Sequence, residues 1–156
     1  MDPKALYNLS SGVFILGTKV DGKINACVTD TCMQVANSPV RIAISVMNTN
    51  LTFEMIKKSK SFSLSVLDET CTFETIKHFG MQSGRYLNKF ETFPYTFDEN
   101  KNPYITKQVC TIISAKVVSE QDLGTHTLFI AEITNAKIIS ESKPITYTDY
   151  QKKIKI

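Results

Sequence analysis

Alternation of apolar and polar residues is the feature that most restricts the fold of this chain. Residues 41–47 place Ile42, Ile44 and Val46 on one face, and residues 61–67 repeat the pattern with serines on the opposite face. Successive side chains of a β-strand point to opposite faces, so both segments are predicted to be strands.

A hairpin is predicted near the N-terminus. The apolar run 13–16 and the segment 24–28 are separated by the pair Asp21-Gly22. A tight turn between antiparallel strands needs positive φ angles, which this pair tolerates, so the pair is a strong hairpin signal. Because the first run is apolar on both faces, the hairpin is expected to be buried on both sides.

Two longer strands are predicted in the second half of the chain, at 106–118 and 127–139. Apolar or small residues recur at alternate positions in both segments. The stretch 122–124, which ends in a glycine, is predicted to form the turn between them.

Two short helices complete the predicted elements. The first covers residues 50–60, with Asn50 as the N-cap and lysines near the C-terminal end, where the helix dipole favours them. The second covers residues 72–79, followed by Gly80 in the position where helices often end in a left-handed residue. Residues 81–102 lack a clear period, and so long a loop in a compact domain is often functional.

These elements predict a mainly β protein, a closed or split antiparallel β-barrel with a few short helices. The chain has 156 residues, which suits one domain spanning 1–156. A doubly wound sheet is excluded because its strands would alternate with long helices.

Composition argues against several classes of protein. The net charge is only +3 and the basic residues form no concentrated stripe, so no nucleic-acid partner is expected. No apolar run reaches the roughly 18–20 residues that span a membrane, and the N-terminus does not resemble a signal peptide. A cytoplasmic protein is therefore expected. The four cysteines contain no C-x2-C pair, so they are expected to be free thiols and no metal site is expected.

The chain carries no motif of hydrolytic or P-loop chemistry, and its two histidines offer little acid–base catalysis. Such proteins often hold a cofactor that performs the reaction. Polar residues gather in three segments and around one histidine, namely 25–35, 45–52, Lys89-Phe90 and Gly124 to Thr127. The second segment precedes a helix N-terminus, where a phosphate binds well. Each of these features also has an interpretation without a ligand: a strand end with turn residues for 25–35, simple helix capping for 45–52, and a structural role for the histidine.

In order and spacing, four stretches resemble the flavin reductase-like family, the FMN-binding split β-barrel flavoproteins. They are LYNLSSGVFILGTKVDGKINACVTDTCMQV, SPVRIAISVMNTNLTFEMIKKSKSFSLSVL, HFGMQSGRYLNKF and GTHTLFIAEITNAKII. The HFG-x-x-SGR and GTHT-x-FI-x-E patterns are most similar to the N-terminal flavoprotein domain of high-molecular-weight rubredoxins. The resemblance implies a homodimer that binds FMN without a covalent bond and accepts hydride from NADH or NADPH.

The resemblance also implies roles for individual residues. It assigns contacts with the flavin ring to five residues, Asn25, Thr29, Asp30, Thr31 and Cys32. It assigns the ribityl chain and phosphate to Ser45, Asn48 and Thr52, with Lys89 as the phosphate counter-charge and Phe90 beside it. His126 is assigned to the place where nicotinamide docks, as the catalytic residue.

Two departures from the family pattern bear on function. Many relatives have arginine where this chain has Lys89, and lysine keeps the charge but loses the two-pronged hydrogen bond. The sequence also contains no C-x2-C iron site, so a rubredoxin acceptor is expected to be a separate chain. Free flavin, ferric iron, oxygen and a monooxygenase stay open as acceptors. The competing hypothesis is a flavin-binding or flavin-sensing module without enzymatic activity.

Overall fold

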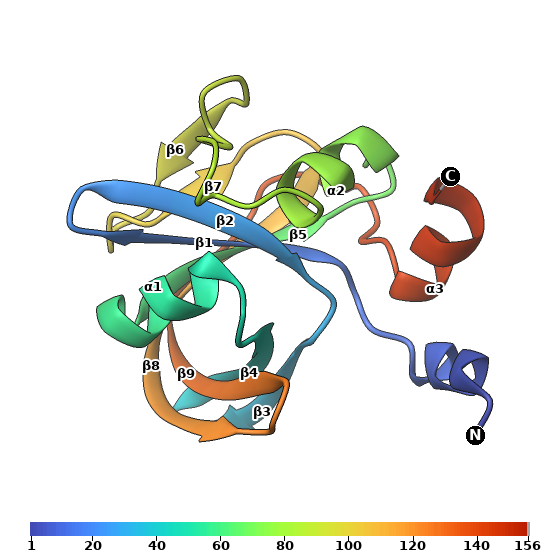
Figure 1. The fold of residues 1–156 in the computed structure, drawn as a ribbon, viewed down its shortest axis with the longest axis horizontal. Helices are drawn as coiled ribbons and strands as arrows, with labels where there is room; N and C mark the ends of the chain where they lie inside the picture. Colours follow the sequence, from blue (N-terminus) through green and yellow to red (C-terminus); the bar gives the residue numbers. More distant parts are fainter. Residues whose placement is uncertain (156) are drawn as a thin grey trace.

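The body of the protein is a seven-stranded antiparallel sheet that curls into a barrel with a gap on one side (Figure 1). The computed structural model describes residues 1–155. In hydrogen-bonded order the strands are β2 (Lys23–Thr29), β1 (Phe14–Val20), β5 (Ser61–Leu67), β8 (Val109–Asp122), β9 (His126–Ile138), β4 (Val40–Met47) and β3 (Cys32–Asn37). The prediction of a mainly β, split-barrel fold is confirmed.

The β1–β2 hairpin forms as the sequence predicts. Asp21 and Gly22 adopt φ angles of 51° and 79° and connect strands paired from Phe14 to Val20. Two neighbouring residues of β1, Ile15 and Leu16, are fully buried on opposite faces of the sheet. The hairpin therefore carries apolar packing on both sides, which fixes the end of β2 in place.

Two hydrophobic cores lie on the two faces of this sheet. The barrel core contains Leu16, Ile44, Phe62, Leu64 and Phe129, together with residues of helix α1 (Leu51–Ser59). The second core gathers residues from β1 and β5, from helix α2 (Phe73–Gly80) and from the C-terminal segment. Apolar residues at alternate positions of β4 and β5 point into the barrel core, which explains the period of two in the sequence.

The helices begin where the sequence predicts, and one of them ends differently. Asn50 caps α1, and its side chain accepts a hydrogen bond from the Thr52 N–H at 2.9 Å. Gly80 is the last residue of α2 and does not have a positive φ, so its prediction as a left-handed residue after the helix is wrong. A Cβ at this position would lie 3.0 Å from the Val28 side chain, so Gly80 allows α2 to approach β2 closely.

The segment predicted as a loop contains part of a small hairpin. Strand β6 (Tyr95–Phe97) pairs with β7 (Pro103–Ile105), a strand too short to show a period in the sequence. The first long strand, β8, starts at Val109, and its pairing with β5 shifts register between Val109 and Thr111, so Val109 does not share a face with the alternate residues that follow. The predicted single face from 109 to 117 is therefore split between the two cores.

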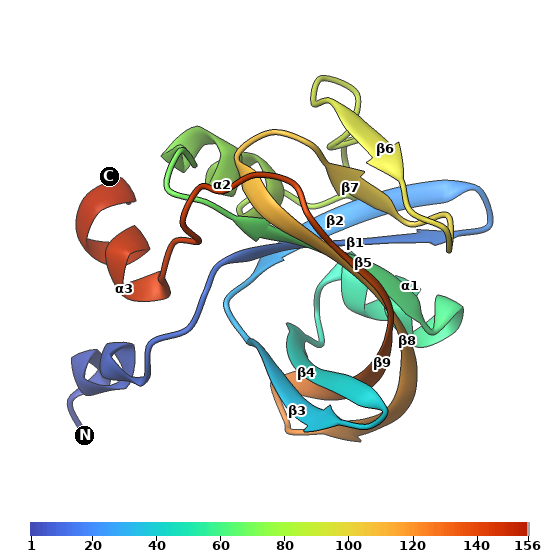
Figure 2. The same ribbon diagram turned by 180° about the vertical axis from the view of Figure 1, so that it is seen from behind.

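The two ends of the chain lie together beside the barrel (Figure 2). They consist of η1 (Pro3–Leu9) at the N-terminus and α3 (Tyr147–Asp149) with η2 (Tyr150–Ile154) at the C-terminus. A backbone hydrogen bond from Tyr147 N to Ser11 O, 2.6 Å long, and a bridge between Gly12 and Thr146 connect them. Among residues 1–155, no helix combines the length and apolar character that crossing a membrane requires.

Candidate functional site

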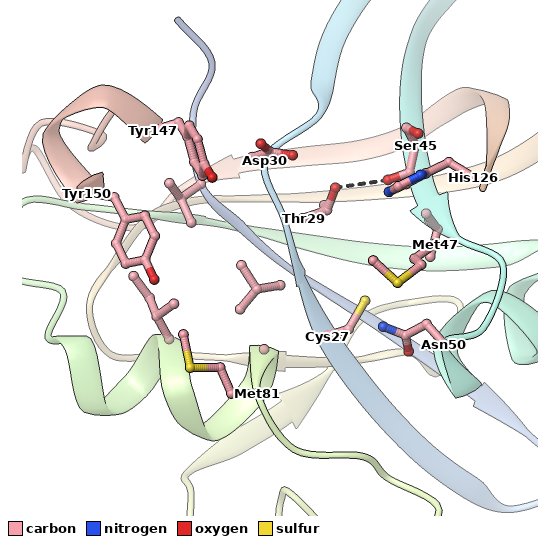
Figure 3. Close-up of a pocket in the computed structure, with 15 residues that line it drawn as sticks. Cys27, Thr29, Asp30, Ser45, Met47, Asn50, Met81, His126, Tyr147 and Tyr150 are labelled. Carbon is pink, nitrogen blue, oxygen red and sulfur yellow. Dashed lines mark hydrogen bonds between the residues drawn. The ribbon is translucent and has the colours of Figure 1, made fainter. Parts of the chain in front are cut away.

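A pocket of about 330 Å³ opens where β2 and β4 end and α1 begins (Figure 3). Four residues predicted for the site line it: Thr29, Asp30, Ser45 and His126. They come from three strands or strand ends that are far apart in the sequence. The curvature of the sheet and the gap between β2 and β4 therefore assemble the pocket.

The end of β2 forms the centre of the pocket. The Thr29 hydroxyl donates to the Ser45 carbonyl at 3.0 Å and accepts from the Thr31 N–H at 3.2 Å. The bond to Ser45 ties β2 to β4, which no ladder of backbone hydrogen bonds joins, and the bond from Thr31 fixes the turn after β2. Asp30 follows directly and also lines the pocket (Figure 3).

The start of helix α1 forms a second wall. Asn50 lines the pocket, and the free N–H groups of the first turn give this end a partial positive charge. Behind this wall, the buried Asn25 amide donates to the Thr52 hydroxyl at 3.0 Å. Asn25 and Thr52, both predicted as cofactor contacts, lie beneath the lining of the pocket and hold β2 against α1.

His126 stands at the start of β9, opposite Met47 of β4. Its Nδ1 lies 2.8 Å from the Thr125 hydroxyl. The neighbouring Asn48 does not line the pocket; it donates to the Gly124 carbonyl at 2.9 Å and accepts from the Thr127 hydroxyl at 2.7 Å. Asn48 thus fixes the β8–β9 turn that carries the histidine.

The C-terminal segment supplies a wall that faces His126 across the pocket. Figure 3 shows Tyr147 and Tyr150 on one side and Ser45, Met47 and His126 on the other. Tyr150 is buried, and burial raises the pKa of its hydroxyl. The Thr146 hydroxyl accepts a hydrogen bond from the Asp149 N–H, which holds this turn in shape. The Tyr150 hydroxyl is therefore neutral at physiological pH, and both rings offer a flat apolar surface with a polar tip.

Thr31 and Cys32 line an adjoining pocket of about 540 Å³. Asp30 and Tyr147 line both pockets, and η1 contributes the far side of the second one. Burial raises the pKa of the Cys32 thiol to about 12, so this cysteine stays protonated and is a weak nucleophile. The structure places these two predicted residues next to the first pocket, outside its lining.

Lys89 and Phe90 do not line either pocket, in contrast to the sequence prediction. The Lys89 side chain is only 2% exposed, and its Nζ donates to the carbonyls of Ala26 and Phe79, each at 2.7 Å. Phe90 is buried in the second core, where its ring lies 5.6 Å from that of Phe79. A phosphate contact by Lys89 is therefore not part of the function proposed below.

The surrounding motif, residues 78–90, supports the pocket: Gly80 and Met81 line it, and other residues of the motif pack behind it. The His78 ring nitrogen Nε2 lies 2.6 Å from the Lys89 carbonyl. A Cβ on Gly84 would lie 2.1 Å from Asn25 Oδ1, so the backbone of this loop packs directly on β2. Arg85 forms two hydrogen bonds with the Glu54 carboxylate on α1, which lowers the pKa of Glu54.

Several lining residues were not predicted from the sequence. Cys27 contributes its thiol to the pocket, and burial raises its pKa. The period of two in β2 places Cys27 on the same face as Thr29, so the signal was present. Tyr147 and Tyr150 carry no comparable signal because they reach the pocket only through tertiary packing of the C-terminal segment.

Comparisons with known proteins identify the family of this chain. The model of the flavin reductase like domain matches residues 6–155. The chain is 34% identical to a high molecular weight rubredoxin of Moorella thermoacetica, over 96% of this chain and 66% of that protein. It is 33% identical to a ferric-chelate reductase (NAD(P)H) of Archaeoglobus fulgidus, over 96% of this chain and 89% of the relative.

Solved structures show the same fold. The flavin reductase PheA2 superimposes with a TM-score of 0.78 at 25% identity, over 94% of this chain and 93% of that chain. The chain spans just under two thirds of the length of the rubredoxin relative. The full activity of that relative is therefore not assigned to this chain. The match to the family model and the identity to the reductase cover nearly all of the chain. The chain therefore belongs to the flavin reductase-like family.

Proposed function

We propose that this protein binds FMN in the pocket beside Thr29 and His126 and catalyses its reduction by NADH or NADPH. The observation that carries the proposal is the convergence of Thr29, Asp30, Ser45 and His126 on one pocket at the N-terminus of α1. One relative is named as an NAD(P)H-dependent ferric-chelate reductase, which supports the choice of donor.

The residues of the pocket fit a flavin. Its volume of about 330 Å³ lies within the range of small-molecule sites, roughly 300–1,000 Å³. One side is apolar, formed by Val13, Val28 and Ile76, and suits the hydrocarbon part of the ring. The other side offers polar groups from Asp30, Ser45 and Asn50, and the N-terminus of α1 favours an anionic phosphate.

Bound FMN supplies the redox chemistry, since it accepts a hydride and passes electrons on. The chain's own residues bind, orient and shield the reacting groups. His126 stands at the side of the pocket formed by β4 and β9, where its imidazole can hydrogen-bond a nicotinamide carboxamide. Tyr147 and Tyr150 close the opposite side and exclude water.

The electrons pass to an acceptor outside the pocket. The similarity to a ferric-chelate reductase and to a rubredoxin supports a ferric chelate or a separate rubredoxin chain as that acceptor. Free flavin stays an alternative. The four cysteines are unpaired, which supports a reducing compartment such as the cytoplasm.

A homodimer of one flavin reductase-like domain per chain is part of the proposal. Apolar side chains are exposed along the edge strand β3 and on η1, including Met33, Val35, Leu6 and Leu9. An edge strand with exposed apolar residues tends to be covered by a partner. Leu6, Leu9 and Met33 line the pocket beside Thr31 and Cys32, so a second copy would cover that opening.

The test is spectroscopic. Purified protein reconstituted with FMN is expected to retain the flavin absorption bands after desalting. Anaerobic addition of NADH or NADPH is expected to bleach these bands within seconds, and comparison of the two rates assigns the donor. Protein that retains no flavin would contradict the proposal. Protein that retains flavin but is bleached only by dithionite would be a flavin-binding module without reductase activity.

A further inference from the structure

Lys89 is a buried lysine that has no role in the function proposed above. Lys89 is 2% exposed, and its Nζ donates two hydrogen bonds of 2.7 Å to backbone carbonyls. None of the ion pairs within residues 1–155 includes Lys89. Burial lowers the pKa of the Lys89 side chain, whereas the two short carbonyl contacts stabilise its ammonium form, so the interior holds a cation with no carboxylate partner.

The two acceptor carbonyls connect Lys89 to two different walls of the pocket. One belongs to Ala26 of β2, directly before the lining residue Cys27. The other belongs to Phe79 in the last turn of α2, directly before the lining residue Gly80. Carbonyls at the end of a helix carry partial negative charge, which suits an ammonium partner. Lys89 therefore fixes β2 against α2 immediately behind the pocket.

This position gives the lysine an electrostatic effect on a bound ligand. Interactions between charges are stronger in the interior than in water, and no opposite charge screens Lys89 there. Two-electron reduction of FMN consumes one hydride, which carries two electrons and a proton from NADH or NADPH, and leaves one additional negative charge on the ring. A cation behind the pocket wall stabilises this reduced form more than the oxidised form.

We propose that Lys89 is a positioning residue that raises the affinity of the pocket for reduced FMN relative to oxidised FMN. The proposal rests on the function proposed above. It differs from the prediction made from the sequence, in which Lys89 binds the phosphate. A phosphate contact would favour FMN over riboflavin in both redox states, whereas a charge behind the wall acts on the ring that both flavins share.

Two substitutions separate the charge from the hydrogen bonds. Lys89→Gln removes the charge and keeps an N–H donor, whereas Lys89→Met removes both. Lys77→Met is the matched control, because Lys77 is an exposed lysine on the same helix as Phe79. For each protein, the melting temperature, the dissociation constants of oxidised FMN and riboflavin, and the midpoint potential of bound FMN are measured anaerobically.

Both Lys89 variants are expected to lower the preference for reduced over oxidised FMN on the order of tenfold. For a two-electron couple, a tenfold change corresponds to a potential about 30 mV lower. FMN and riboflavin are expected to lose affinity equally, and Lys77→Met is expected to match the wild type. Should the methionine variant fail to fold, the glutamine variant carries the comparison.

Two results would overturn the inference. A glutamine variant with the wild-type potential would show that Lys89 acts only through its hydrogen bonds. A loss of FMN affinity much larger than that of riboflavin would show that Lys89 reaches the phosphate. If the wild-type protein binds neither flavin, the proposed function itself fails, and this outcome is visible before any variant is compared.

Discussion

At the scale of single residues, several polar side chains that resemble ligand contacts in the sequence serve the scaffold. Asn25 and Thr52 bond to each other beneath the pocket, and Asn48 holds the β8–β9 turn. Buried polar groups must be hydrogen-bonded, and here their partners lie within the protein. The residues that can contact a ligand are neighbours of these scaffold residues, such as Asp30 and His126.

Replacement of His126 by alanine is expected to slow reduction of bound FMN by NADH or NADPH about tenfold, the loss of one good positioning contact. FMN affinity is expected to change little, because the imidazole ring of His126 stands at the edge of the pocket. Anaerobic stopped-flow absorbance measures the rate, with reduction by dithionite as the control. A variant with a lower melting temperature and an unchanged rate would show that His126 only packs the strand end.

Gly84→Ala is expected to destabilise the protein by about 1–3 kcal/mol, the usual cost of overpacking. The new Cβ would lie 2.1 Å from Asn25 Oδ1, and that amide cannot move without breaking its bond to Thr52. Urea unfolding measures the loss. In the double variant with Asn25→Ala the clash disappears, so the two losses should not add; additive losses would contradict the contact.

At the scale of elements, the start of helix α1 joins folding to binding. Asn50 caps the helix through its Oδ1 and also lines the pocket. The helix would begin here in any fold that keeps the cap, but only the approach of β2 and β4 turns its N-terminus into a wall of a pocket. The same backbone N–H groups thus stabilise the helix and favour an anion.

Asn50→Asp tests this double role. Aspartate caps a helix as well as asparagine, so the melting temperature is expected to hold, whereas Asn50→Ala is expected to cost about 1 kcal/mol. The added carboxylate is expected to weaken FMN about tenfold, equivalent to about 1.4 kcal/mol, and riboflavin less. Fluorescence titration measures both affinities. An equal loss for the two flavins would place the phosphate away from α1.

At the scale of the whole molecule, the open barrel leaves two edge strands, β2 and β3. The β2 edge is covered by α2 and by the segment around Gly84. The β3 edge exposes Met33 and Val35, with exposed fractions of 64% and 50%. An unprotected apolar edge favours association, which is the physical basis for the proposed homodimer.

Sedimentation at micromolar concentration is therefore expected to give about twice the chain mass of 17.5 kDa. Val35→Lys is expected to produce a monomer, because a charge on an edge strand opposes pairing. Ile138→Lys is the control, since Ile138 is also an exposed apolar strand residue, on β9. A wild-type monomer with full flavin occupancy would exclude the dimer.

The sequence by itself determined six of the seven strands of the main sheet, all but β3, together with the hairpin turn and the starts of α1 and α2, because these depend on local properties. Alternation along 41–47 and 61–67, the pair Asp21-Gly22 and the capping residue Asn50 all act within a few residues of chain. It also led to the family, because the motifs keep their order along the chain. The short β6–β7 hairpin was not predicted from the sequence, because strands of three residues are too short to show a period of two.

Only the tertiary structure decided which polar residues face the pocket. Lys89 and Asp30 are both charged, yet packing buries Lys89 on two carbonyls and leaves Asp30 lining the pocket. Tyr147 and Tyr150 join the site through the return of the C-terminal segment past Gly12. Which side chains converge depends on contacts between residues that are more than a hundred positions apart, and no local pattern encodes such contacts.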